Sequence, residues 1–149
     1  MLISTKGRYA LRVMVDLAEH TADGRTPLRI IAERQGISEK YLENILSALV
    51  RADLLSGLRG KAGGYCLTRS ARDISVGEVL RITEGSLAPV ACLDSEHLEC
   101  EHASNCRTVE VWRELNALIG GYLDGVTLAD LAPGEEDAFA QDVLGARPE

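Results

Sequence analysis

Three segments near the start of the chain repeat apolar residues every three or four positions, which is the spacing of a helix with one buried face. The first begins after Ser4 or Thr5, either of which can cap it, and continues for about fifteen residues. The second covers residues 28–35; Pro27 precedes it and Gly36 follows it, as is common at helix starts and ends. This part of the pattern therefore predicts two helices.

The third helical segment follows the second after a very short connection. It is expected to run from about residue 39 to residue 52, with Ser38 as its N-cap. Its apolar face consists of Leu42, Ile45, Leu46 and Leu49. Two helices joined by a short turn that contains glycine form the pattern of a helix-turn-helix. Since any short helical hairpin gives the same pattern, DNA binding does not follow from it alone.

The next segment alternates in the manner of two short strands, residues 54–58 and 65–68, around a glycine-rich loop. Arg59 and Lys61 lie in this loop, so the hairpin has a basic tip that can reach a minor groove. An ordinary solvated hairpin is the alternative. Together with the helix pair, the basic hairpin predicts a winged helix-turn-helix, and hence a DNA-binding domain, in residues 1–72.

Helical spacing returns in residues 75–85 and again in residues 108–126, whereas residues 86–105 between them have no periodicity. The later helix is longer than a small winged domain needs for its own core, so its apolar face is a candidate dimer interface. A two-fold dimer would match a palindromic operator. Thr127 is expected to cap a last helical turn.

The expected fold is therefore mainly α-helical with a small β-hairpin wing, a winged helix-turn-helix followed by a long C-terminal dimerisation helix. We expect residues 73–132 to hold the dimerisation helices and a cysteine-containing sensor loop. The last segment, residues 133–149, is acidic and bounded by Gly and Pro, which predicts a mobile tail.

The distribution of charge changes the interpretation of the acidic composition. The net charge of −7 argues against a nucleic-acid partner, because phosphate binding depends on clustered Lys and Arg. However, residues 1–72 carry 12 Lys and Arg against 7 Asp and Glu, whereas residues 73–149 carry 4 against 16. The basic charge is thus concentrated where the DNA-binding surface is expected.

No segment approaches the roughly 18 apolar residues of a membrane helix, and the N-terminus lacks the apolar stretch of a signal peptide. We expect a cytoplasmic protein with no membrane partner. Thiols stay reduced in that compartment, so the four cysteines are expected to be buried residues, metal ligands or redox sensors rather than disulfides.

Three of the cysteines form a C-x7-C-x5-C array, Cys92, Cys100 and Cys106, ahead of the long helix. Soft thiolates in a compact loop suit zinc or an iron–sulfur cluster. A zinc site could take its fourth ligand from His97 or His102. Both kinds of centre are consistent with the spacing.

The remaining cysteine, Cys66, lies on the second expected strand, which favours a small packed residue over a ligand. A small enzyme with one of the loop thiols as its nucleophile is a further hypothesis. The sequence does not favour it, because no Cys/His/Asn set lies on a rigid element next to an expected pocket. We therefore expect no enzyme activity.

Three motifs resemble the Rrf2 family of bacterial transcription regulators, of the IscR, RirA, NsrR and CymR types. They are STKGRYALRVMVDLA, ISEKYLENIL and RGKAGGYCL, and the likeness extends over about residues 1–132. The motifs are long and correctly spaced relative to one another, so the match is specific to the family. The resemblance implies a homodimeric winged helix-turn-helix protein that binds double-stranded promoter DNA and dimerises through its long C-terminal helix.

The resemblance also implies which side chains contact DNA. Positions that match the base-reading residues of the family's recognition helix are Ser38, Lys40, Glu43 and Asn44. Glu43 can accept from cytosine, Asn44 can pair with adenine, and Lys40 can reach a guanine or a phosphate. The family's wing arginine, which enters the minor groove, corresponds to Arg59. Backbone contacts are expected from Lys61, Lys6, Arg8 and Arg29. The intervening Tyr41 and Leu42 are expected to hold the helix to its neighbours.

For the cysteine loop, the resemblance implies an iron–sulfur cluster in preference to zinc, with [2Fe–2S] and [4Fe–4S] both open. The spacing is more similar to that of RirA-type members than to that of IscR-type members. IscR-type members have a histidine ligand three residues after the last cysteine, where this chain has Val109. Candidate fourth ligands here are His97, His102, Glu101 and Glu110, besides a residue of the partner subunit or an exogenous ligand.

A second hypothesis within the same family is a CymR-like repressor without a cluster. Such a protein would be controlled by a regulatory protein partner or by the redox state of its thiols. CymR-like chains need no three-cysteine array, so the array favours the cluster.

Overall fold

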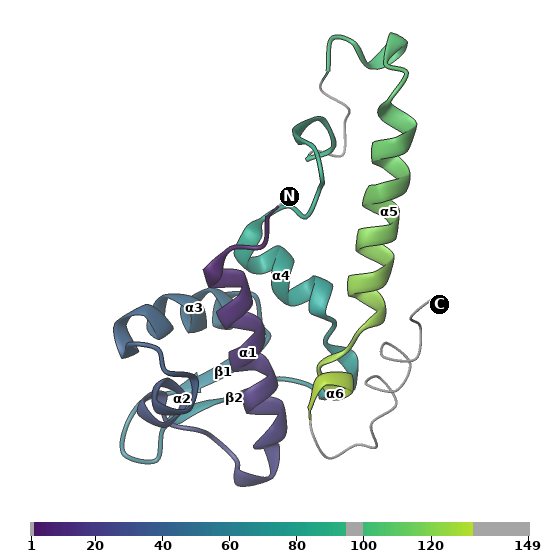
Figure 1. The fold of residues 1–149 in the computed structure, drawn as a ribbon. Coiled ribbons are helices and arrows are strands. Elements are labelled where there is room, and N and C mark those ends of the chain that lie inside the picture. The colour runs from purple at the N-terminus through teal and green to yellow at the C-terminus, as the bar shows by residue number, and fades with distance from the viewer. Residues whose placement is uncertain (1, 95–99, 133–149) are drawn as a thin grey trace.

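The computed structural model describes residues 2–94 and 100–132, and the elements in them follow the expected order (Figure 1). The helices are α1 (Thr5–Glu19), α2 (Leu28–Gln35), α3 (Glu39–Arg51), α4 (Val76–Glu84), α5 (Val109–Gly125) and α6 (Leu128–Leu131). Strands β1 (Leu55–Leu58) and β2 (Gly64–Leu67) form the hairpin between α3 and α4. The prediction of a mainly helical fold with a small hairpin is confirmed. The tail expected at 133–149 lies outside the described residues.

The turn between α2 and α3 is fixed by a residue at each end. Gly36 ends α2 with φ of 64°, a left-handed conformation that glycine adopts at little cost. The Ser38 hydroxyl begins α3 by accepting a hydrogen bond from the Tyr41 backbone N–H at 3.3 Å. Helix α3 ends at Arg51, one residue earlier than expected, with Ala52 as its C-cap. The helix-turn-helix geometry is thus set locally.

A single apolar core joins α1, α2, α3 and the hairpin. The inner face of α3 is completely buried: Leu42, Ile45, Leu46 and Leu49. Burying each such side chain stabilises the fold by about 1.5–3 kcal/mol, so this face determines how α3 is held. Ile74, Val79 and Leu128 belong to the same core, which places α4 and α6 directly on the helix-turn-helix. None of the helices in the described parts of the chain is long and apolar enough to cross a membrane.

The hairpin is antiparallel and pairs Leu55 with Leu67 and Leu58 with Gly64. The structure begins β1 one residue later than expected, and β2 covers 64–67 rather than 65–68. Both strands are short, and two-stranded hairpins of this size are only marginally stable alone. The hairpin therefore needs support from the rest of the fold.

That support comes from the chain segment before α2. Thr26 and Tyr65 exchange two backbone hydrogen bonds of 2.9 Å, so this segment extends the hairpin by a third short pairing. Gly64 makes the approach possible, because a Cβ atom there would lie 2.5 Å from the Thr26 carbonyl, and its φ of +147° is itself unusual for other residues. Arg25 also donates to the backbone oxygen and the hydroxyl of Ser56. The wing is thus anchored to the helix-turn-helix.

Helix α5 runs beside α4 and continues beyond it (Figure 1). At one end the two helices are joined by Arg81, whose guanidinium donates to both carboxylate oxygens of Asp124 at 2.6 and 2.9 Å. This pairing holds the pKa of Asp124 below its usual value and raises that of Arg81. Because both side chains are about half exposed, the pair adds little stability and mainly fixes orientation. The loop that carries the cysteines lies at the opposite end of α5.

Candidate nucleic-acid interface and cysteine loop

The outer face of α3 carries the side chains that were expected to read bases. Ser38, Lys40, Glu43 and Asn44 are all exposed on this face. In contrast, Leu42 is completely buried, and the Tyr41 ring packs edge-on against the Tyr9 ring of α1 with centroids 6.1 Å apart. The structure thus separates the residues that hold α3 from those that it presents to solvent.

The polar groups on this face are available to an external ligand. The side chains of Lys40, Glu43 and Asn44 make no hydrogen bond or ion pair with any residue that the structure describes. The same holds for Arg59 and Lys61, which are exposed at the tip of the hairpin. Free cations near the start of α3 and at the tip of the hairpin are suited to an anionic partner.

The three further cations expected to contact a DNA backbone are either partly buried or already paired within the protein. Lys6 is half-buried on α1, and Arg8 donates to the Thr5 hydroxyl at 3.3 Å. Arg29, on α2, lies 3.6 Å from the carboxylate of Glu33. Both Arg29 and Glu33 are largely exposed, so their pairing is weak and can be exchanged for a phosphate.

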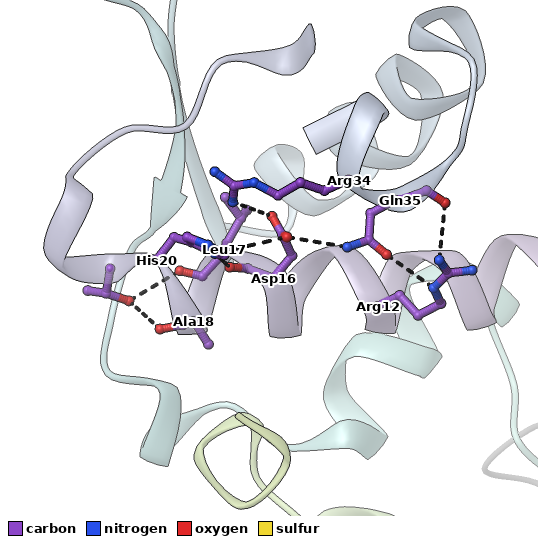
Figure 2. A network of polar contacts seen from close by, with 8 residues as sticks. Arg12, Asp16, Leu17, Ala18, His20, Arg34 and Gln35 are labelled. Atoms are coloured by element: carbon purple, nitrogen blue, oxygen red, sulfur yellow. Dashed lines mark hydrogen bonds and ion pairs between the residues drawn. The ribbon is translucent and has the colours of Figure 1, made fainter. Parts of the chain in front are cut away.

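A buried carboxylate that the sequence analysis did not single out ties α1 to the end of α2 (Figure 2). Asp16 is only 5 % exposed, and it accepts hydrogen bonds from Arg34 at 3.2 Å and from Gln35 at 3.3 Å. Gln35 in turn accepts from Arg12 at 3.1 Å. Arg34 and Gln35 immediately precede the turn into α3, so this network orients the presented helix. A signal was present, since Asp16 lies among the apolar positions of α1, where charges are rare.

His20 is the C-cap residue of α1. Its ring Nδ1 is 2.7 Å from the backbone oxygen of Asp16. Among the described residues, only Asp16, Glu19 and His20 place three potential metal-ligating atoms within 4.8 Å of one another. Since Asp16 is already bonded to Arg34 and Gln35, we interpret this cluster as structural.

Replacing Asp16 with Asn should therefore destabilise the protein. The amide keeps the size of the side chain but removes the charge that Arg34 and Gln35 share, and hydrogen bonds to a charged group are worth about 1.5–3 kcal/mol each. We expect the free energy of unfolding in urea to fall by about 2–3 kcal/mol. Glu19→Gln makes the same chemical change at an exposed position and should stay within about 0.5 kcal/mol of the wild type. Equal stability of the two variants would contradict the role of the network.

The loop between α4 and α5 brings three free cysteines to the surface of the described structure. Cys92 lies in a short 3-10 turn (Ala91–Leu93), Cys100 precedes a second turn (Ala103–Asn105), and Cys106 follows that turn. All three thiols are half-buried and unpaired. The Cys106 sulfur lies 3.4 Å from the Thr108 hydroxyl, and hydrogen bonds from Thr108 and the start of α5 lower the pKa of this thiol.

The chemistry of these donors fits an iron–sulfur centre. Accessible thiolates are the ligands that such clusters use, and the lowered pKa of Cys106 favours its thiolate form. The three sulfur atoms do not lie within 4.8 Å of one another in the described structure.

The candidate fourth ligands differ in their surroundings. Glu101 and His102 are exposed in the loop, beside Cys100. Glu110 is also exposed, but Arg113 donates to its carboxylate at 2.6 Å. His97 lies outside the described residues. No one of these residues is singled out by the geometry, so the fourth ligand stays a prediction with several candidates.

Comparisons with known proteins give a consistent result. The Rrf2 family model, described as an iron-dependent transcriptional regulator, matches residues 3–134. The chain is 39 % identical over 142 residues to the HTH-type transcriptional regulator IscR of Serratia proteamaculans, which covers 95 % of this chain and 85 % of that one. IscR of Photobacterium profundum is 39 % identical over 145 residues, covering 97 % and 81 %.

Solved structures with the same fold include regulators of two kinds. CymR, the global cysteine regulator of B. subtilis, has a TM-score of 0.73 and 37 % identity, covering 89 % of this chain and 96 % of that one. IscR of T. potens has a TM-score of 0.69 and 36 % identity, covering 100 % and 93 %. These relatives are transcriptional regulators rather than enzymes, and their fold agrees with the winged helix-turn-helix described above.

Proposed function

The chain belongs to the Rrf2 family of transcriptional regulators, and on this basis we propose a homodimer that binds palindromic promoter DNA under the control of an iron–sulfur cluster. The observation that carries the DNA-binding part is the set of exposed, unpaired polar side chains on α3 and at the hairpin tip. A helix held by its inner face and presenting such groups outward is suited to the major groove.

In the proposed docking, the first turns of α3 read bases. Asn44 pairs with adenine, Glu43 accepts from a cytosine amino group, and Lys40 reaches a guanine or a phosphate. Ser38 contributes its hydroxyl at the start of the helix. At the wing, Arg59 enters the adjacent minor groove and Lys61 contacts a phosphate. Positioning contacts to the backbone come from Lys6, Arg8 and Arg29.

Dimerisation is proposed through the exposed face of α5. Only Val109 of this helix is buried, whereas four large apolar side chains remain exposed: Val111, Leu115, Leu118 and Tyr122. Their spacing of four, three and four residues forms one stripe along the helix, which is the spacing of a seam between paired helices. Two copies joined by this stripe would present two copies of α3 to the two halves of a palindrome.

The proposed cluster is held by Cys92, Cys100 and Cys106. When bound, it supplies an oxygen- and redox-sensitive link between this loop and the start of α5. The helix that leads into the loop is connected to the helix-turn-helix through Glu84, the last residue of α4. The Glu84 carboxylate accepts hydrogen bonds from the backbone N–H and hydroxyl of Ser4, the N-cap of α1, at 3.1 and 2.6 Å.

This contact leaves little room for relative movement. A Cβ atom on Gly7 would lie 2.1 Å from the Glu84 carboxylate, so α1 and α4 approach each other closely at this point. The loop that carries the cysteines follows α4, which ends at Glu84. A rearrangement of this loop that moves Glu84 would therefore move the start of α1 through the contact between Glu84 and Ser4. We propose this contact as the route by which the loop influences the orientation of α3.

The DNA-binding part is tested by Lys40→Ala and Arg59→Ala. The wild type first selects its preferred duplex from a random-sequence library, and each variant is then titrated against this selected duplex by fluorescence anisotropy. Since a base contact is worth about 1–3 kcal/mol, each variant should bind at least about fivefold more weakly, with unchanged thermal unfolding. Unchanged affinity in both variants would contradict the proposed docking.

A further inference from the structure

A groove of about 420 Å³ lies between the C-terminal half of α3 and the hairpin. This wing groove is lined by both elements: Ser47, Val50 and Arg51 of α3, with Gly57, Leu58, Arg59 and Tyr65 of the hairpin. Two arginines thus line one groove, and none of the described residues that line it is a carboxylate. Arg51 was not among the DNA contacts expected from the sequence.

Arg51 continues the polar face of α3 that begins with the base-reading residues. Lys40, Asn44, Ser47 and Arg51 follow one another at intervals of four, three and four residues, so they lie along one side of the helix. All four are exposed, and none of their side chains makes a hydrogen bond or ion pair with a described residue. The stripe therefore leads from the proposed major-groove contacts directly into the wing groove.

We infer that the wing groove binds a phosphate of the DNA backbone through Arg51 and Ser47. This inference rests on the proposed docking, in which α3 occupies the major groove and Arg59 enters the adjacent minor groove. One sugar–phosphate strand separates these two grooves, so it must pass between α3 and the hairpin. The wing groove is the place where the protein meets that strand.

The lining of the wing groove suits a nucleotide backbone. The Arg51 guanidinium can donate two parallel N–H groups to phosphate oxygens, and the Ser47 hydroxyl can donate a further hydrogen bond. Val50 and Leu58 are 37 % and 55 % exposed, so their apolar side chains can contact deoxyribose carbons. The groove thus offers both charge and apolar surface, which suits a backbone made of phosphates and sugars.

A purely structural role for Arg51 makes different predictions. It lies in the last turn of α3, where a cation stabilises the helix dipole by about 0.3–1 kcal/mol. In that case Arg51→Ala would lower the thermal stability and leave the salt dependence of DNA binding unchanged. Arg51→Lys, which keeps the charge, would then have no effect on either quantity.

The test is a titration of Arg51→Ala against two duplexes, the selected one and an unrelated sequence, between about 0.05 and 0.2 M salt. Each phosphate contact contributes about 0.9 to the slope of log K against log salt, which corresponds to about eightfold in affinity at 0.1 M. We expect the variant to lose about 0.9 of slope and about eightfold in affinity on both duplexes. Arg51→Lys should keep most of the slope while binding more weakly than the wild type.

Arg69→Ala is the matched control, because it removes a cation of the same half of the chain that is already bonded to Glu78 and to the Asp73 backbone oxygen. Its slope should equal that of the wild type. An unchanged slope for Arg51→Ala, or a loss confined to the selected duplex, would overturn the inference while leaving the proposed docking intact. If the wild type itself binds neither duplex, the proposed function fails together with this inference.

Discussion

Leu118→Glu is expected to convert the protein from a dimer into a monomer. Leu118 is 70 % exposed at the centre of the apolar stripe of α5, so in the proposed dimer it is covered by the partner helix. Two copies of an acidic side chain would then be brought together in an apolar interface, where unpaired charges are strongly unfavourable. Size-exclusion chromatography with light scattering should show the mass fall from twice 16.1 kDa to 16.1 kDa.

Leu118→Glu should also bind the selected duplex at least about a hundredfold more weakly. A dimer that contacts two half-sites at once binds more tightly than a monomer on one half-site by about this factor. Leu58→Glu is the control for the oligomeric state. It makes the same substitution at a leucine of the hairpin that is 55 % exposed, and it should leave the dimer intact. A wild type that is already monomeric, or a Leu118→Glu variant that stays dimeric, would contradict the assignment of α5.

Cys106→Ala is expected to remove the iron–sulfur cluster. The protein purified without oxygen should show visible absorption and contain iron and acid-labile sulfide, and this variant should show neither. Cys106 is the candidate ligand whose pKa is lowered by hydrogen bonds from Thr108 and the start of α5, so its thiolate form is favoured. Cys92→Ala and Cys100→Ala should behave in the same way.

Cys66→Ala is the matched control for these measurements. Cys66 is also half-buried and unpaired, but it lies on β2 opposite Ser56, within the hairpin. Its replacement should leave the iron and sulfide content unchanged. A colourless wild type with stoichiometric zinc, or with no metal, would contradict the cluster and favour control by thiol oxidation or by a protein partner.

The parts of the fold that the sequence predicted well are those fixed by neighbouring residues. Gly36 and Ser38 determine where α2 ends and α3 begins through their own backbone and side-chain preferences. The buried face of α3 follows directly from the spacing of its leucines and isoleucine. Because an amphipathic helix has only one face to bury, the same spacing also indicated which side chains remain exposed.

Contacts between distant residues were not predictable in the same way. The pairing of Thr26 with Tyr65 and the hydrogen bonds from Ser4 to Glu84 join positions far apart in the chain, and neither has a local sequence pattern. The expected strand boundaries place Gly64 in the glycine-rich loop, whereas in the structure it belongs to β2 and its missing Cβ allows close approach to Thr26. Such pairings depend on how the elements pack, which a helical or strand period does not specify.

The candidate site shows the same division. The helical period placed Lys40 and Asn44 on the outer face of α3, and the position of Arg51 on that stripe could have been deduced from the same period. The place of Arg51 in the wing groove could not be deduced from the helical period, because the groove depends on how the hairpin packs beside α3. The spacing of the cysteines indicated soft-metal chemistry, whereas the fourth ligand depends on how the loop folds, which the spacing does not specify.

The most direct test of the proposed regulator compares one preparation with and without its cluster. The anaerobically purified protein and the same protein after chelator treatment are titrated against the selected duplex at fixed salt, and both are checked for dimeric mass. Coupling between two sites typically changes affinity by about 5–150-fold, so we expect the two dissociation constants to differ at least about fivefold. Equal affinities of two intact dimers would contradict control of DNA binding by the cysteine loop.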